Sequence, residues 1–195
     1  MSLAVRIAAA SVLVAALLGA ATSAGAAGAP AKWVVDKAAS HLGFTGSSHG
    51  SSFDGAFRRW DADIQFDPKA LDASKAVVTV DLASASSGDD ERDDKMPTSD
   101  WFDVANFAKA TFTTRSIKAA GEGRYTATGD LSLHGVSKPI ELPFSLAITG
   151  DQATMTGEVT LNRLDFGIGQ ANYGSGDEVG LDVVVKVSLS AHRAP

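Results

Sequence analysis

One serine in this 195-residue chain stands in a pattern that could do covalent chemistry. Residues 46–50 match G-x-S-x-G, in which a hydrolase raises its nucleophile, here Ser48, on a turn between a strand and a helix. Here the motif lies between two predicted β-strands, with no parallel α/β pattern around it. A Ser/Gly loop is therefore the favoured interpretation. A small hydrolase that uses Ser48 and a spatially adjacent histidine is kept as an alternative.

An acidic run and four histidines are the candidate metal ligands. Residues 89–94 lack both the alternating oxygen ligands and the glycine of a calcium loop, so the run is predicted to be a solvated turn. The histidines form no H-x-H or H-E-x-x-H pair, and they are His41, His49, His134 and His192. The chain has no cysteine, which excludes disulfides and thiolate metal sites. We predict no metal site and no catalytic residue.

Charge and length limit the classes of function. The formal net charge of −6 argues against a nucleic-acid partner and gives no attraction to anionic membrane surfaces. A mature body of this size is predicted to be one domain, because it can bury roughly 70% of its unfolded surface without disulfides or metals.

The first 26 residues have the layout of a secretory signal peptide. Arg6 gives a short positive start, residues 7–18 are apolar, and Ala24-Gly25-Ala26 is the predicted cleavage site. The apolar run is short for a span of about 30 Å of hydrocarbon, although an uncleaved anchor is the alternative. We therefore predict a mature chain of residues 27–195 that is periplasmic or secreted and has no stable membrane insertion after cleavage.

The elements that would position a site are mostly β-strands. Residues 129–149 are predicted to be two strands joined by a turn at Gly135, because apolar and polar residues alternate along both. Pro139 and Pro143 cannot donate a backbone hydrogen bond, so their missing donors must face an edge or a bulge. The apolar face of these strands comprises Leu131, Leu133, Ile140, Leu142, Phe144, Leu146 and Ile148.

About eight strands in sequence, mostly joined by short turns, predict an antiparallel barrel or sandwich. A change of parity at Arg58-Arg59 predicts a bulge, and residues 47–52 are predicted to be a loop. Residues 86–107 are the one substantial non-β insertion, in which the spacing of Trp101, Phe102 and Phe107 fits a helical turn or two. The pattern does not decide whether an eight-stranded barrel is packed with side chains or holds one ligand. An interaction or stress-protection module with a solid core is therefore a second alternative.

Residues 129–140, GDLSLHGVSKPI, closely resemble the signature of the YceI family of bacterial periplasmic proteins. The resemblance covers roughly residues 32–192. Further segments that match in the same order are Phe66-Asp67-Pro68, Arg92-Asp93, Trp101-Phe102-Asp103, Ala110-Thr111-Phe112, Asp165-Phe166-Gly167-Ile168-Gly169 and Val179. The chain departs from the family pattern after Arg92-Asp93, where the family often has His-Leu and a later Ser. Lys95-Met96-Pro97-Thr98 stands there instead, and Lys95 offers a positive charge.

The resemblance implies a lipocalin-like barrel with a long apolar cavity that binds lipid or isoprenoid without catalysis. We therefore expect an all-β, eight-stranded antiparallel barrel with a short helical insertion around residues 86–107. Its expected ligand is a long-chain apolar small molecule, a polyisoprenoid lipid, an isoprenoid quinone or a fatty-acid-like lipid, bound for transport, storage or stress protection. Trp101 and residues 57–60 resemble a subgroup associated with membrane cytochromes, which points to a quinone-like ligand. No other cofactor is expected, and a homodimer is left open.

The site residues expected in such a barrel fall into two groups. The expected cavity lining, with the insertion aromatics capping one end, is Phe44, Phe57, Val80, Leu82, Trp101, Phe102, Phe107, Phe112, Leu131, Leu133, Leu142, Phe144 and Phe166. The expected contacts to a polar head group are Arg92, Lys95, His134 and Arg163.

Overall fold

The computed structural model of the chain describes residues 29–195. The predicted signal peptide, residues 1–26, and its cleavage site lie outside the described residues, so the division into residues 1–26 and 27–195 stays a prediction.

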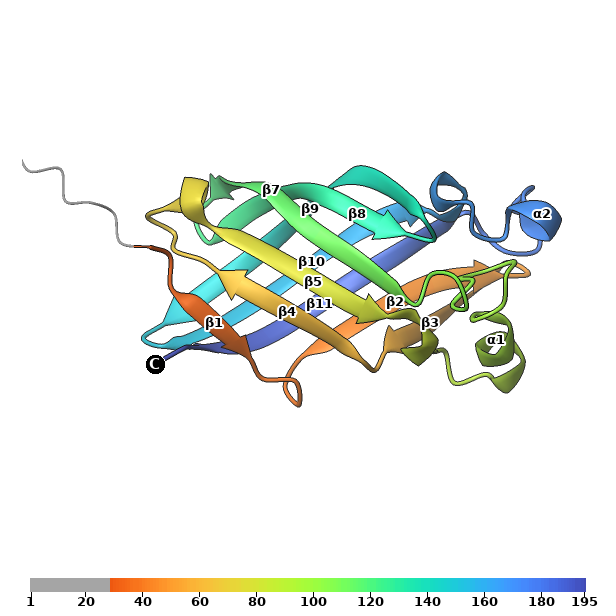
Figure 1. Ribbon diagram of the computed structural model, residues 1–195, viewed down its shortest axis with the longest axis horizontal. Helices are drawn as coiled ribbons and strands as arrows, with labels where there is room; N and C mark the ends of the chain where they lie inside the picture. Colours follow the sequence, from red (N-terminus) through yellow and green to blue (C-terminus); the bar gives the residue numbers. More distant parts are fainter. Residues whose placement is uncertain (1–28) are drawn as a thin grey trace, which may run out of the picture.

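Eight antiparallel spans of chain form the body of the molecule (Figure 1). Three of the spans are interrupted and appear as pairs of shorter strands: β1 (Lys32–Val35) with β2 (His41–Ser48), β3 (Ser51–Phe57) with β4 (Trp60–Gln65), and β5 (Lys75–Asp81) with β6 (Ala85–Ser86). The other five are β7 (Lys109–Gly121), β8 (Arg124–Leu133), β9 (Val136–Thr149), β10 (Gln152–Asn162) and β11 (Asp182–Arg193). The interruption between β3 and β4 falls at Arg58-Arg59, where the change of parity predicts it.

The spans pair with their sequence neighbours and close on themselves. The order is β1-β4-β5-β7-β8-β9-β10-β11, and β11 returns to pair with both β1 and β2. Trp33 lies opposite Arg193 in the pairing that closes the ring. The predicted eight-stranded antiparallel barrel is therefore confirmed, and the alternative of a two-sheet sandwich is wrong.

The β8–β9 hairpin has the turn that its sequence predicts. Leu133 pairs with Val136, which leaves only His134 and Gly135 in the turn. Their φ angles are 51° and 75°, the left-handed values that a tight two-residue hairpin needs. Glycine adopts such values without strain, and His134 is one of three non-glycine residues with positive φ among residues 29–195.

The prediction of a loop at residues 47–52 is wrong. β2 runs to Ser48 and β3 starts at Ser51, so a two-residue turn, His49-Gly50, replaces the loop. Both turn residues have positive φ, 48° and 77°. The polar side chains of this segment gave no alternating pattern from which a hairpin could be predicted, because strands at the end of a barrel need no apolar face toward a core.

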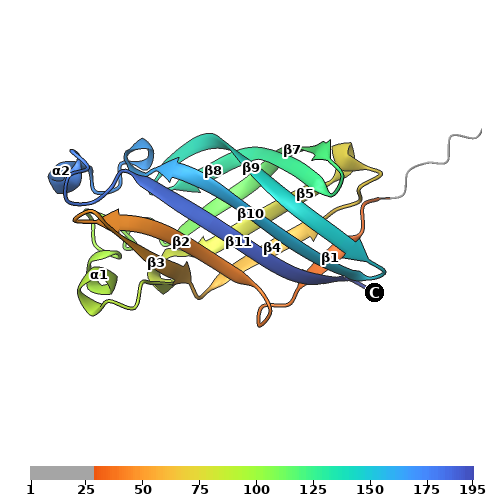
Figure 2. The same ribbon diagram turned by 180° about the vertical axis from the view of Figure 1, so that it is seen from behind.

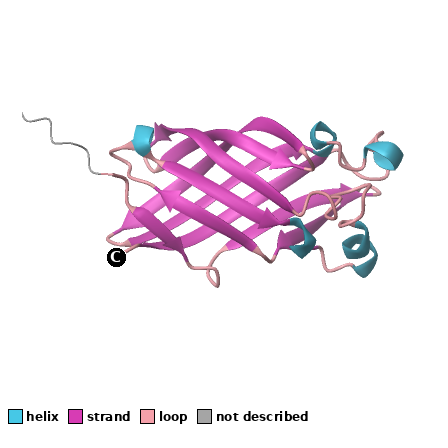
Figure 3. Cartoon of the chain, in the orientation of Figure 1, coloured by secondary structure: helices cyan, strands magenta, loops and turns pink. Residues whose placement is uncertain are grey.

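The insertion also differs in detail from the prediction. Helix α1 (Asp90–Lys95) forms in the acidic run, and the segment from Trp101 to Phe107 consists of turns. The Asp89 side chain accepts the Arg92 N–H and caps the helix, whose acidic first turn and basic last turn suit the helix dipole. Figure 3 shows that the helical segments lie at the two ends of the barrel, and the others are Leu71–Ala73, Leu82–Ser84, Arg163–Phe166 and α2 (Gln170–Tyr173).

The two ends of the barrel differ. One end, where β1 begins and the chain ends, is closed by a packed cluster of buried residues: Trp33, Phe66, Ile117, Ala127, Ala153 and Ala191. The Trp33 indole N–H donates to the Phe66 carbonyl at 3.0 Å within this cluster. The other end carries α1 and α2 (Figures 1 and 2), and it is the end at which the polar loops gather.

Candidate functional site

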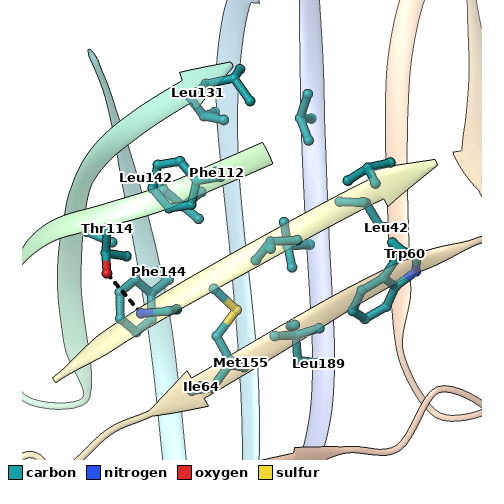
Figure 4. Close-up of a pocket in the computed structure, with 18 of the residues that line it drawn as sticks. Leu42, Trp60, Ile64, Phe112, Thr114, Leu131, Leu142, Phe144, Met155 and Leu189 are labelled. Carbon is teal, nitrogen blue, oxygen red and sulfur yellow. Dashed lines mark hydrogen bonds between the residues drawn. The ribbon is translucent and has the colours of Figure 1, made fainter. Parts of the chain in front are cut away.

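The interior of the barrel is hollow. A cavity of about 240 Å³ runs between the strands, and its wall is almost wholly apolar. Figure 4 shows side chains from several strands that point into this main cavity, among them Phe112, Phe144 and Met155. Thr114 is a polar exception, and its Oγ1 accepts the Ala76 backbone N–H at 2.8 Å, so this polar group of the wall is satisfied.

Burial along β9 shows that the cavity lies behind the inward face. Outward residues of β9 are exposed, whereas every inward residue is only partly buried, and none is fully buried. In a solid core such residues would lose nearly all of their accessible surface. Here the remaining surface of Ile140, Leu142, Phe144, Leu146 and Ile148 faces the cavity.

Alternation along the strands places most of the predicted lining in this wall. The predicted residues that line the main cavity are Phe57, Val80, Leu82, Phe102, Phe112, Leu131, Leu133, Leu142 and Phe144. Further lining residues absent from the prediction include Leu42, Trp60, Ile64, Val78, Ile140, Leu146, Met155, Val159, Leu161, Val185, Val187 and Leu189. Their period-2 alternation was the available signal, because every apolar face of a closed barrel points inward.

A second cavity of about 420 Å³ lies at the end that carries α1 and α2, and we call it the entrance cavity. Three predicted lining residues, Phe44, Trp101 and Phe166, line this cavity and not the main one. Five residues line both cavities and mark where they meet: Phe57, Phe102, Leu133, Leu161 and Val185. The two cavities therefore adjoin, and together they fall within the roughly 300–1,000 Å³ typical of ligand pockets.

Aromatic side chains connect the rim of the entrance to the junction of the two cavities. The Phe44 ring lies 6.5 Å from the Phe53 ring and 5.3 Å from the Phe57 ring, between centroids. Phe57 in turn lies 6.1 Å from Phe102. Aromatic rings bury much apolar area with little flexibility, so this row offers a firm surface to an apolar chain.

Three of the predicted head-group residues, Arg92, Lys95 and Arg163, line the entrance cavity. Arg92 and Lys95 belong to α1. The Arg92 guanidinium lies 4.1 Å from the centroid of the Phe53 ring, and Lys95 Nζ lies 2.7 Å from a carboxylate oxygen of Glu91. The hydrogen bond that Lys95 donates to Glu91 raises the pKa of Lys95 above its usual value, so Lys95 carries a positive charge at neutral pH.

Arg163 has a structural role that its sequence position did not reveal. Its side chain is buried, and all five guanidinium N–H donors go to backbone carbonyls, those of Ile168, Gly169, Tyr173, Val179 and Gly180. No donor remains for a ligand, so the predicted head-group contact is replaced by a role in holding the loop between β10 and β11. A Cβ at Gly169, whose φ is +64°, would come within 2.7 Å of this guanidinium.

His134 and Phe107 line neither cavity. The His134 Nδ1–H donates to the Phe166 carbonyl at 2.8 Å, and its ring packs edge-on against Phe107 at 5.3 Å between centroids. The predictions that His134 contacts a head group and that Phe107 caps the cavity are therefore replaced by packing around the β8–β9 turn. The segment from Trp101 to Phe107 is not helical, and Trp101 lines the entrance cavity whereas Phe107 packs on His134.

The Ser48 motif lies in an open hairpin at the entrance. Ser48 and His49 both line the entrance cavity, where Ser48 ends β2 and His49 starts the turn to β3. This is not the strand-to-helix turn of a hydrolase nucleophile. Within residues 29–195, no three His, Asp or Glu side chains come together as a metal site would require. None of the helices in that range is long and apolar enough to cross a membrane.

Known proteins resemble this chain in sequence and in fold. The family model for the YceI-like domain matches residues 33–191. A UPF0312 protein of Pseudomonas savastanoi pv. phaseolicola is 37% identical over 147 residues, which are 71% of this chain and 77% of that protein. The crystal structure of Burkholderia cenocepacia BcnA has a TM-score of 0.77 at 29% identity and covers 80% of this chain and 99% of its own.

A more distant structural neighbour has a described ligand class. It is a polyisoprenoid binding domain from Saccharophagus degradans, implicated in plant cell wall breakdown. Its TM-score is 0.67 at 19% identity, and the likeness covers 84% of this chain and 99% of that domain. At this identity the likeness shows that the two chains share a fold.

Proposed function

The chain belongs to the YceI family, and we propose that it is a non-catalytic binding protein that holds one long apolar amphiphile inside its barrel. The leading ligands are a polyisoprenoid lipid and an isoprenoid quinone. The ligand is bound for transport, storage or stress protection outside the cytoplasm.

The hollow, apolar interior carries this proposal. The inward residues of the strands line one continuous apolar wall instead of filling a core. Destabilisation in large-to-small core variants grows by about 24 cal/mol per Å³ of cavity, so an empty cavity of 240 Å³ would cost on the order of 6 kcal/mol. That cost is comparable with the whole stability of a typical domain, about 5–15 kcal/mol. A ligand that fills the cavity offsets it, which favours binding over the solid-core alternative.

The apolar chain of the ligand contributes more to affinity than its head group. Each buried CH₂ contributes about 0.8 kcal/mol, so one five-carbon isoprene unit contributes roughly 4 kcal/mol before the entropy of binding is subtracted. Exposed ion pairs, such as those that Arg92 or Lys95 could form with a head group, contribute about 0–1 kcal/mol. We therefore expect selection by chain length and shape, with the entrance cations acting on the orientation of the ligand.

The fold shared with a polyisoprenoid binding domain supports the ligand class, since that domain has the same barrel architecture. The open hairpin around Ser48 and the family membership both favour binding over hydrolysis.

Native mass spectrometry of the freshly purified, exported protein tests the proposal. We expect a non-covalent adduct of a long-chain apolar molecule that is lost under denaturing conditions and recovered in the organic phase. A protein of bare chain mass that takes up neither polyprenol nor ubiquinone on incubation would contradict the proposal.

Export is tested separately by N-terminal sequencing of the same material. We expect the mature chain to begin near Ala27. Membrane-bound protein that keeps the segment from Met1 to Leu18 would mean that the segment is an anchor instead of a signal peptide.

A further inference from the structure

Strand pairing in the barrel wall stops part-way along β9 and β10. The ladder between these strands begins where Thr149 pairs with Gln152 and ends where Phe144 pairs with Gly157. β9 continues back to Val136 and β10 continues on to Asn162, each still paired on its other side. In the same register, 139–143 of β9 and 158–162 of β10, both within the described residues, therefore face each other without strand pairing. We call these two stretches the seam, and Figure 2 shows the two strands side by side.

Two prolines explain why the pairing stops there. The Leu146 N–H donates to the Gly123 carbonyl, which lies on the β8 side of β9. Backbone donors alternate between the two sides of an antiparallel strand, so the N–H positions of residues 139, 141 and 143 face β10. Pro139 and Pro143 occupy two of these three positions and have no N–H to donate. Of the three positions in the seam, only Glu141 keeps its donor.

A hollow on the outer surface marks one end of the seam. It is lined by outward residues, including Pro143, Glu158 and Lys186, and by Phe144 and Val187, which also line the main cavity. Gly157 contributes no side chain at this point, and a Cβ there would come within 2.8 Å of the Pro143 carbonyl oxygen. The outer hollow and the main cavity therefore share Phe144 and Val187 as lining residues where the ladder ends.

Contacts at the entrance close the other end of the seam. Lys138 Nζ lies 2.6 Å from a carboxylate oxygen of Asp165, and His134 donates to the Phe166 carbonyl. The barrel end itself is covered by two loops tied to each other. The Gly169 N–H donates to the Asp100 carbonyl at 2.7 Å, and the rings of Trp101 and Tyr173 lie 5.3 Å apart.

We propose that the seam is a side port through which an apolar chain passes between β9 and β10 into the main cavity. The inference rests on the proposed function, because it assigns a route to the ligand held there. The apolar chain slides between Leu142 and Val159, and its polar head stays outside until the chain is seated. Opening this route breaks no strand pairing between β9 and β10, whereas a route between β10 and β11 must break a ladder of eleven residue pairs.

Restoring the missing donors should close the port. In a double variant, Pro139→Thr with Pro143→Thr, two N–H groups are returned to the β10 side. The matched control is Glu141→Thr, which changes an outward side chain of the same strand and leaves its backbone donors unchanged. The probe is cis-parinaric acid, a fluorescent long-chain polyene, excited in stopped-flow by energy transfer from Trp60 in the cavity wall.

We expect the double variant to slow both association and dissociation by about tenfold, because two more backbone hydrogen bonds must break for each passage. The equilibrium affinity should change by less than about threefold, because the lining of the cavity is intact. The control should exchange at the wild-type rates.

A cross-link gives an independent measurement that does not depend on how the double variant folds. The chain has no cysteine, so Glu141→Cys with Thr160→Cys introduces a unique pair on the outer face of the seam. A short, reducible bis-thiol cross-linker across this pair should slow exchange, and reduction should restore it. The control pair is Ser145→Cys with Thr156→Cys, which lie opposite each other where the ladder is complete.

The outcomes separate the port from the proposed function. Wild-type protein that binds no probe overturns both. Normal binding with unchanged exchange rates in the double variant and in the cross-linked seam overturns the port alone. The same holds if Trp101→Ala, which opens the end of the barrel, accelerates exchange while closing the seam has no effect.

Discussion

Leu133 lies where the main and entrance cavities meet, so its side chain should matter more to a ligand than to the fold. In Leu133→Gln, water can solvate the amide in the ligand-free barrel, but an apolar chain would bury it unpaired. An unpaired buried polar group costs about 1–3 kcal/mol, so we expect a loss of affinity for polyprenol of roughly 5- to 150-fold by titration. Stability of the ligand-free protein should change less.

Ser132→Gln is the matched control, because it puts the same amide on the exposed face of the same strand. Its affinity should equal that of the wild type. Equal affinities of both variants would mean that the ligand does not pass or occupy the junction of the cavities.

Arg163 should affect the fold, since five backbone carbonyls depend on its guanidinium. Lysine has one compact ammonium group and cannot reach all five, so we expect Arg163→Lys to lower the free energy of unfolding by roughly 3 kcal/mol in urea denaturation. Arg115→Lys is the control, because Arg115 is exposed and paired with Asp130, and such pairs contribute about 0–1 kcal/mol. Equal costs for the two variants would refute the structural role.

For single residues, the sequence predicts the direction of a side chain where the strand alternates. It does not predict a role that depends on groups brought together only in the folded chain. The inward direction of Leu131, Leu133 and Phe144 follows from period-2 alternation. The role of Arg163 does not, because the carbonyls of residues 168–180 meet it only after the loop has folded. For the same reason, the positive charge of Arg163 suggested a contact to a ligand, whereas in the structure its guanidinium binds backbone carbonyls.

Among the elements, α1 has an anchor that responds to acid. Asp93 accepts hydrogen bonds from Ser86 Oγ at 2.7 Å and from the Ser87 N–H at 2.6 Å, which tie α1 to β6. Burial alone would raise the pKa of the Asp93 carboxyl, but the hydrogen bonds from Ser87 and Ser86 outweigh it and lower the pKa. The anchor therefore stabilises the fold above the unfolded-state pKa of about 3.9 and is lost as the pH falls through the lower folded-state value.

Asp93→Asn should accordingly destabilise the protein at pH 7 and matter much less at pH 3. The measurement is the difference in free energy of unfolding between wild type and variant at the two pH values. Asp94→Asn, at the exposed neighbouring position and outside this set of hydrogen bonds, is the matched control. A difference that is the same at both pH values would mean that the Asp93 carboxylate does not anchor the helix in its charged form.

Elements were predictable from sequence where packing sets a clear period. The strands and the His134-Gly135 turn follow from alternation and from a glycine in the turn. The helical insertion expected around residues 86–107 is present as α1, but its place in the acidic run was not predicted. Its six residues bury no apolar face, so only the cap and the charge order could have indicated it. The polar hairpin at His49-Gly50 was missed because strands at the entrance contact the loops there instead of a core.

For the whole molecule, the alternation of apolar and polar residues along the strands predicts neither that the sheet closes into a barrel nor that the barrel is hollow. Alternation fits a sandwich as well as a barrel, and closure depends on β11 pairing with both β1 and β2, far away in sequence. Whether an eight-stranded barrel is filled depends on side-chain volumes and on the tilt of the strands. The resemblance to a family, and not the periodicity, predicted the cavity.

We propose that a ligand, and not side chains, fills the barrel. This proposal is tested most directly by the thermal stability of delipidated and polyprenol-loaded protein, for wild type and Phe144→Ala. Loading at a hundred times the dissociation constant should stabilise wild type by about 2.7 kcal/mol, which raises Tm by roughly 5–10 °C. In the delipidated protein, Phe144→Ala should cost less than the roughly 3–5 kcal/mol of a solid core, because the cavity beside Phe144 already exists. Equal stability of delipidated and loaded wild type, with the full solid-core cost for Phe144→Ala in both, would contradict the account.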